Sequence, residues 1–203
     1  MALAGVLAVA GFMDAFGNVM ELIVDLETDR LTYYYATLPL PMWVVFLQKI
    51  VAMALFSTIQ TLAFIPVAKL LLWNIFDPWA VNWFYVAVAM FFGNVFYAAF
   101  TLFIASYVKS RQHMNSAWRS FIFPLWFLGG FGFTWQIIYQ VSPAFAYAEL
   151  LNPIIYVSEA YRVAFLGQAG MLNFWLCIGA MMLFTVFTGW VGIKRLKKRC
   201  DFI

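Results

Sequence analysis

Five long runs of apolar residues dominate the sequence, and short polar segments separate them. The runs cover Ala2–Met20, Val44–Leu72, Val81–Val108, Phe121–Val141 and Leu172–Ile193. A helix needs roughly 20 predominantly apolar residues to cross the hydrocarbon core of a bilayer. Each run therefore predicts one membrane-spanning helix. The whole chain, residues 1–203, is predicted to be one all-α polytopic membrane domain with about five spans.

Composition supports this prediction and excludes a soluble protein. Hydrophobic residues make up 66% of the chain and charged residues 10%. An average soluble domain carries about 25% charged residues. The net charge of +3 comes mostly from the basic tail, residues 194–203, which gives no indication of nucleic acid as a partner. The two cysteines, Cys177 and Cys200, provide neither a disulfide framework nor a metal-ligand pattern, so no metal site is predicted.

Lysine and arginine in the connecting segments predict the orientation of the chain. Loop 109–119 and tail 194–203 are basic, whereas the segment 142–170 contains only Arg162. Cytoplasmic loops carry the excess of Lys and Arg, so the loop and the tail are predicted to be cytoplasmic. Alternation of spans then places loop 21–43 inside as well, with the N-terminus and the segment 142–170 outside.

The segment 21–41 predicts a short helix at the cytoplasmic face. Thr28 is a suitable N-cap, and Asp29 favours the positive end of the helix dipole. Pro39 disfavours helix at the preceding residue. An apolar stripe at spacings i, i+3, i+4 and i+7 is formed by Leu31, Tyr34, Tyr35 and Leu38. Taken alone, the pattern favours an ordinary interfacial helix that seats the next span.

The segment 142–167 contains two successive helix-start signals. Ser142-Pro143 and Asn152-Pro153 each place a capping residue before a proline suited to the first helical turn. The second helix runs to about Leu166, and Gly167 can close it. Such helices are too short to cross a bilayer. The pattern predicts an extracytoplasmic re-entrant helical hairpin.

Four polar residues are singled out at membrane depth. Glu159 and Arg162 lie three residues apart, on one helix face, and are predicted to pair. The pair either neutralises itself at the interface or takes part in gating. Asp14 and Asn94 are the polar residues deepest in apolar runs. Each either lines a polar transport path or bonds a neighbouring helix.

Three motifs together resemble the membrane subunits of type-2 ABC exporters, which move polysaccharides, lipids and drugs. The first is Asn152-Pro153 followed by Glu159 and Arg162, similar to the family signature NP-x-x-y-x-x-E-a-x-R. The second is Glu27 to Pro39, similar to the coupling segment E-x-G-T-l-e-x-L-l-a-t-P but without its Gly-Thr pair. The third is Pro124 to Gly130, similar to P-l-x-f-l-s-G.

The resemblance implies how the protein would work. The chain has no Gly-Lys-Ser or Gly-Lys-Thr phosphate loop, so ATP and Mg²⁺ are expected on a separate ATPase subunit and no cofactor on this chain. A homodimer or heterodimer of permeases in a bacterial cytoplasmic membrane is expected, with lipids around it. Residues 1–20 resemble the family's second span, so the first span is expected to be missing.

The resemblance also assigns roles to residues. It implies coupling to the ATPase through Glu27, Thr28, Asp29, Arg30, Leu31, Tyr34, Tyr35, Leu38 and Pro39. It implies an outer gate built from Asn152, Pro153, Glu159 and Arg162. No catalytic residue is implied.

Other functions stay open at this point. An ion-coupled secondary transporter needs ionisable residues at mid-membrane, and only Asp14 meets this requirement clearly. An intramembrane enzyme lacks support, since no His-Glu-x-x-His or Gly-x-Ser-x-Gly occurs and His113 lies in a basic loop. A membrane assembly protein that transports nothing is the third alternative.

Overall fold

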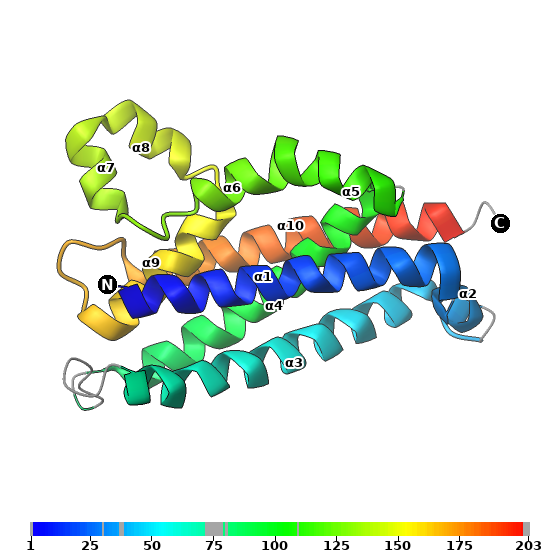
Figure 1. Ribbon diagram of the computed structural model, residues 1–203, viewed down its shortest axis with the longest axis horizontal. Coiled ribbons are helices and arrows are strands. Elements are labelled where there is room, and N and C mark those ends of the chain that lie inside the picture. Colours follow the sequence, from blue (N-terminus) through cyan, green and yellow to red (C-terminus); the bar gives the residue numbers. More distant parts are fainter. Residues whose placement is uncertain are drawn as a thin grey trace.

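The computed structural model describes residues 2–29, 31–36, 39–71, 79, 81–108 and 110–200 (Figure 1). Within these ranges the regular elements are all helical. They are α1 (Ala2–Val24), the π-helix η1 (Asp25–Asp29), α2 (Leu31–Ala36), α3 (Met42–Leu71), α4 (Trp83–Tyr107), α5 (Arg111–Ala117), the π-helix η2 (Trp118–Ile122), α6 (Phe123–Phe127), α7 (Trp135–Val141), α8 (Pro143–Glu149), α9 (Pro153–Leu166) and α10 (Phe174–Cys200).

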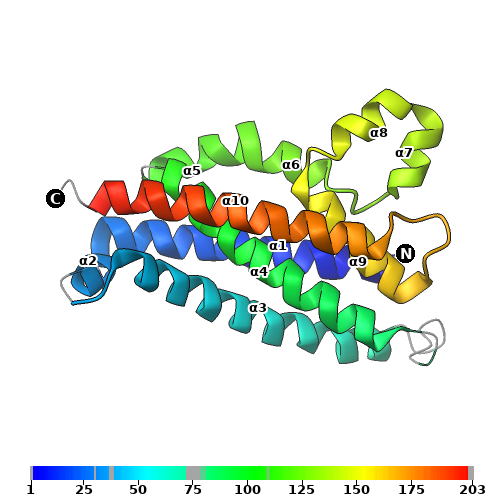
Figure 2. The same ribbon diagram turned by 180° about the vertical axis from the view of Figure 1, so that it is seen from behind.

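Four helices in the described part of the chain are long and apolar enough to cross a membrane. They are α1, α3, α4 and α10, with candidate spans Ala4–Glu27, Met42–Leu70, Trp83–Tyr107 and Phe174–Arg199. Helix α4 is the most buried of the four and packs against α1, α3, α9 and α10, as Figures 1 and 2 show from opposite sides. The prediction of an all-α polytopic membrane protein is confirmed.

The prediction of one continuous span over Phe121–Val141 is wrong. Helical structure runs from Arg111 through η2 and α6 to Phe127, residues 128–134 form a loop, and α7 begins at Trp135. The helical run therefore starts inside the predicted loop 109–119. Two glycines explain the break. Gly130 has a backbone φ of 71°, which residues with a side chain rarely adopt, and Gly129 packs directly against the Ile154 side chain.

The two ends of the bundle carry different segments. In Figure 1, α2, the start of α5 and the C-terminal end of α10 lie at one end, and the N-terminus and the loop between α9 and α10 lie at the other. Helix α10 stays helical into the predicted tail, and Arg195 stacks on the Tyr107 ring at 3.8 Å. The segments predicted to be cytoplasmic therefore share one end of the molecule.

One end of α1 packs closely against the loop that follows α6. A Cβ atom at Gly5 would lie 2.5 Å from the carbonyl oxygen of Phe131, whereas one at Gly17 of the same helix would meet nothing within 4 Å. Phe12, two turns along α1, also contacts the Phe131 ring, with 6.5 Å between centroids. The first turns of α1 thus hold the loop 128–134 in place.

We expect Gly5→Ala to destabilise the protein and Gly17→Ala not to. The methyl group at position 5 must push the loop backbone away, and such overpacking typically costs about 1–3 kcal/mol. At position 17 the higher helix propensity of alanine should stabilise by up to about 1 kcal/mol. Thermal unfolding of both variants in the same detergent measures the difference. Equal unfolding temperatures would mean that the loop is not fixed by α1.

Candidate functional site

The predicted coupling segment forms η1 and α2 at the end of α1. Glu27, Thr28 and Asp29 lie in η1, Leu31, Tyr34 and Tyr35 lie in α2, and Pro39 lies in the bend before α3; Arg30 and Leu38 lie outside the described residues. The prediction that Thr28 caps a helix is wrong, because Thr28 is inside a continuous π-helical turn. Tyr34 is exposed, Tyr35 is half-buried, and Thr32 is fully buried.

Asp25, which lies outside the predicted coupling residues, anchors the coupling segment to the bundle. Its carboxylate accepts hydrogen bonds from the backbone N–H of Thr32 at 3.1 Å and from the Thr32 hydroxyl. It also pairs with the Lys49 ammonium of α3 at 2.7 Å. Glu27 accepts a hydrogen bond from the backbone N–H of Arg111 at 3.2 Å, the start of α5. The segment is thereby tied to α3 and to α5.

Asp14 lies in a polar cleft between α1 and α3. The Ser57 hydroxyl and the Asn18 amide, the latter at 3.3 Å, donate hydrogen bonds to its carboxylate. The cleft has a volume of about 410 Å³, and its polar lining consists of Asp14, Asn18, Glu21, Lys49 and Gln60. The α1 members of this set recur at helical spacing, so the sequence contained a signal that was not used.

Asn94 does not join Asp14 in this cleft. Its side chain is buried in α4 and donates a hydrogen bond to the Thr58 hydroxyl of α3 at 3.1 Å. Of the two uses that the sequence left open for Asn94, the structure shows a bond to a neighbouring helix. A role of either residue in a transport path stays a prediction.

Both helices of the predicted outer hairpin, residues 142–167, begin at a predicted proline, but the Ser142 side chain makes no capping hydrogen bond. The Asn152 side chain accepts a hydrogen bond from the Ile154 N–H at 3.1 Å, and Pro153 occupies the first turn of α9. The amide of Asn152 also donates to the carbonyl of Leu125 at 2.7 Å, which ties the corner to α6. Most of α9 is buried against α1, α4 and α10, so it lies inside the bundle although it is too short to span it.

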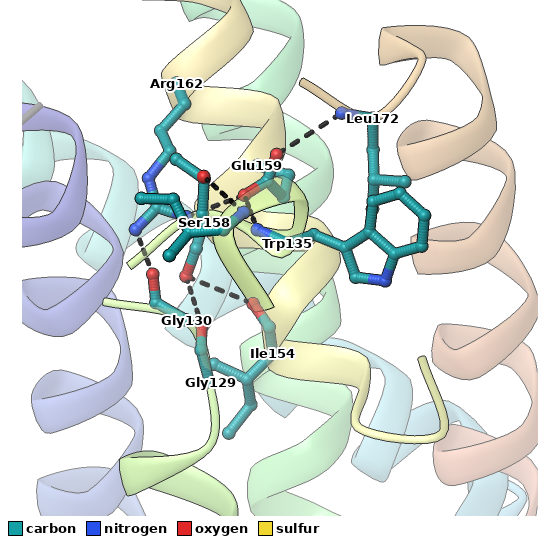
Figure 3. A network of polar contacts seen from close by, with 10 residues as sticks. Gly129, Gly130, Trp135, Ile154, Ser158, Glu159, Arg162 and Leu172 are labelled. Carbon is teal, nitrogen blue, oxygen red and sulfur yellow. Dashed lines mark hydrogen bonds and ion pairs between the residues drawn. The ribbon is translucent and has the colours of Figure 1, made fainter. Parts of the chain in front are cut away.

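Glu159 and Arg162 form the predicted pair at the centre of a buried network (Figure 3). Their side chains are 0% and 2% exposed, and Arg162 Nη1 lies 2.7 Å from Glu159 Oε1. The Glu159 carboxylate also accepts hydrogen bonds from the backbone N–H groups of Trp135 at 3.1 Å and Leu172 at 3.3 Å. Both charges are thus satisfied by specific partners.

The loop 128–134, which contains Gly129 and Gly130, supplies carbonyl oxygens that accept hydrogen bonds from side chains of α9. Arg162 Nη2 donates a hydrogen bond to the carbonyl of Gly130, and the Ser158 hydroxyl donates to the carbonyl of Gly129 at 2.7 Å (Figure 3). The sequence analysis identified the motif that contains these glycines but not this use of their carbonyl oxygens. The broken helix and the buried arginine therefore depend on each other.

Comparison with known proteins assigns the chain to a class. The described residues form a bundle of apolar helices, with the short helix α2 at one end and α7, α8 and α9 towards the other (Figure 1). The chain matches the family model of the ABC-2 type transporter over residues 1–166, and it belongs to that family. It is therefore an integral membrane protein and a permease component of an ABC transporter, a class that is typically non-catalytic and works with an ATP-binding subunit. No curated protein and no solved structure matches it.

Proposed function

We propose that this chain is the permease of an ABC exporter in a bacterial cytoplasmic membrane. It moves a lipid, polysaccharide or drug-like substrate outward, driven by ATP and Mg²⁺ on a separate ATPase subunit. The observation that carries this proposal is the anchoring of the coupling segment 21–41. Helix α2 exposes Tyr34, and the segment that contains it is held by Asp25 against α3 and by Glu27 against α5, so it can transmit a displacement caused by a partner.

Helix α1 connects the two functional ends of the molecule. It continues directly into η1 at one end, and at the other its Gly5 contacts the backbone of Phe131. The loop that contains Phe131 holds Arg162 through the carbonyl of Gly130. A displacement of the coupling segment is therefore applied to a helix whose far end touches the loop that fixes the outer hairpin. In this proposal Asn152, Pro153, Glu159 and Arg162 close the exit.

The polar cleft supports a paired permease. Ionisable groups at membrane depth are costly next to lipid and usually face water or another protein surface. Asp14 and Glu21 border a partly open cleft of about 410 Å³ at the surface of the single chain. We propose that a second permease subunit, identical or related, covers this side, so that the cleft becomes part of the transport path.

The ATPase contact can be tested on the exposed face of α2. The double variant Tyr34→Ser with Tyr35→Ser removes the two aromatic rings, which contact each other at 6.0 Å between centroids. Losing aromatic contacts worth about 1.4 kcal/mol or more should reduce the co-purified ATPase subunit at least about tenfold. Affinity purification of the tagged permease with quantification of the bound chain is the measurement, and that chain must contain a Gly-Lys-Ser or Gly-Lys-Thr phosphate loop.

Tyr147→Ser is the matched control, because Tyr147 is an exposed tyrosine of α8, in the outer hairpin. It should leave the amount of bound ATPase unchanged. Full binding to the α2 double variant would refute the coupling role of this helix. A bound ATPase whose hydrolysis is insensitive to the permease would instead favour the assembly protein that transports nothing.

A further inference from the structure

Glu149 is a buried carboxyl group that none of the motifs includes. It is the last residue of α8, at the corner where the chain turns into α9, and the backbone N–H of Asn152 donates to its carbonyl at 2.8 Å. The residue is 4% exposed. Within the described part of the chain, neither carboxyl oxygen has a hydrogen-bond partner. An ionised carboxylate without donors is strongly disfavoured in such a place.

The nearby charges do not compensate a negative charge on Glu149. The charged groups of the described residues that act on it are Glu159 and Arg162, both on α9. Arg162 is already bonded to Glu159 and to the Gly130 carbonyl. Burial, and secondarily the Glu159 carboxylate, raise the pKa of Glu149 to about 7, while Arg162 acts in the opposite direction.

The corner at Glu149 ends a helix that packs outside the bundle, and it borders a cavity. Helices α7 and α8 pack mainly on each other and stand beside the bundle in Figure 1. Trp135 Nε1 donates to the carbonyl of Ala146 at 2.9 Å within this arch of α7 and α8. A cavity of about 220 Å³, lined by Leu125, Leu128, Phe145, Leu151 and the corner residues, lies between the arch and α6. A small movement of the corner would let water reach the carboxyl group.

We propose that Glu149 is a proton-controlled latch of the outer hairpin: the neutral acid keeps the corner of α8 closed on α9, and loss of the proton releases it. Only the description of the hairpin as an exit rests on the proposed function. Ionisation puts a second carboxylate beside Arg162, which already pairs with Glu159, and opening the corner hydrates the new charge. No other reactant is required, because the proton passes to water.

The direction of the pH effect follows from linkage. The closed hairpin raises the pKa of Glu149 from 4.5 to about 7. In the open hairpin water reaches the carboxyl group, and its pKa returns to the ordinary value. The closed form therefore binds the proton more tightly. The extra stability of the closed form is complete when the pH is below the ordinary pKa of Glu149. It is lost as the pH rises through the raised pKa of about 7. Between about pH 5.5 and about pH 8 the open fraction should rise about 10- to 30-fold.

Hydrogen–deuterium exchange of the purified full-length permease tests the latch. The reporting amides are those of Leu150, Leu151 and Asn152, which donate to carbonyls of the last turn of α8. After correction for intrinsic rates, their protection in the wild type should fall about 10- to 30-fold from about pH 5.5 to about pH 8. Glu149→Gln should stay protected with less than about a twofold change, because it has no proton to lose. His113→Gln, which removes an exposed histidine of α5 in the segment 109–119, should respond like the wild type.

Three results would overturn the latch. They are a wild-type protection that does not change with pH, a pH response that persists in Glu149→Gln, and a response equally large in the peptides of α4. If Glu149→Gln does not fold, Glu149→Asp, which keeps the acid, must show the pH response. The experiment needs neither ATPase nor substrate. Its failure therefore leaves the proposed export function intact, and a failed co-purification leaves the latch intact.

Discussion

Replacing Arg162 by alanine is expected to cost about 3–5 kcal/mol of stability, the usual penalty for breaking a buried ion pair by removing one partner. The change leaves the carboxylate of Glu159 buried with the N–H groups of Trp135 and Leu172 but without its cation. It also leaves the carbonyl of Gly130 without the Nη2 donor. The fraction of monodisperse protein and the unfolding temperature in detergent measure the loss.

Glu159→Ala should be at least as damaging as Arg162→Ala. An orphaned carboxylate can bind a proton and become neutral, whereas an orphaned guanidinium stays charged at any accessible pH. The double change Glu159→Ala with Arg162→Ala removes both charges and should recover part of the loss. Recovery should be incomplete, since three backbone groups lose their partners. Arg119→Ala, an exposed arginine of η2, is the control and should have little effect. Additive losses in the double variant would show that the two residues are not coupled.

Local sequence signals located the hairpin because its caps are local. Asn152 and Pro153 start α9 as predicted, and Gly167 ends it with a φ of 90°. A cap needs only a side chain two or three residues from the backbone groups that it satisfies. The same reasoning placed Glu159 and Arg162 on one face of α9, one turn apart. Their burial inside the bundle is a tertiary property, and the sequence left open whether the pair was interfacial.

The break after α6 could not be read from hydropathy. Phe121–Val141 contains no charged residue and is long enough to span, but hydropathy measures the cost of transfer and not the continuity of a helix. What stabilises the loop is distant in sequence: Ser158 and Arg162 bond the carbonyls of Gly129 and Gly130. A pair of glycines is compatible with close packing or with a bend, and only these contacts decide between the two.

The anchors of the site were missed because polar residues were judged singly. Asp25 follows the last residue of α1 and continues the face of that helix that contains Asp14, Asn18 and Glu21. Lys49 lies early in a predicted span, where an unpaired cation would be costly. Considered together, the helical spacing and the isolated cation would have predicted that a carboxylate of α1 pairs with α3. For Glu149 the sequence gives no comparable signal, since its lack of partners depends on the folded corner.

Asp25→Asn is expected to uncouple the permease from its ATPase without unfolding it. The amide keeps the shape of the side chain but removes the charge that strengthens the bonds from Thr32 and Lys49. Hydrogen bonds to charged groups contribute about 1.5–3 kcal/mol, so the anchored position of α2 should become at least about tenfold less populated. The part of ATP hydrolysis that depends on the permease, measured in proteoliposomes with the co-purified ATPase, should fall by a similar factor.

The unfolding temperature should hardly change, because α1, α3, α4 and α10 keep their packing. Lys49→Met should have an effect in the same direction, and combining it with Asp25→Asn should add little, since the two changes remove one interaction. The exchange Asp25→Lys with Lys49→Asp should restore the ion pair only in part, because the backbone N–H of Thr32 then faces an ammonium group. Gln112→Ala, an exposed change at the same end of the molecule, should leave hydrolysis as it is. If Asp25→Asn supports normal hydrolysis, the ATPase acts on the permease through a different contact, and the bonds of Asp25 are only structural.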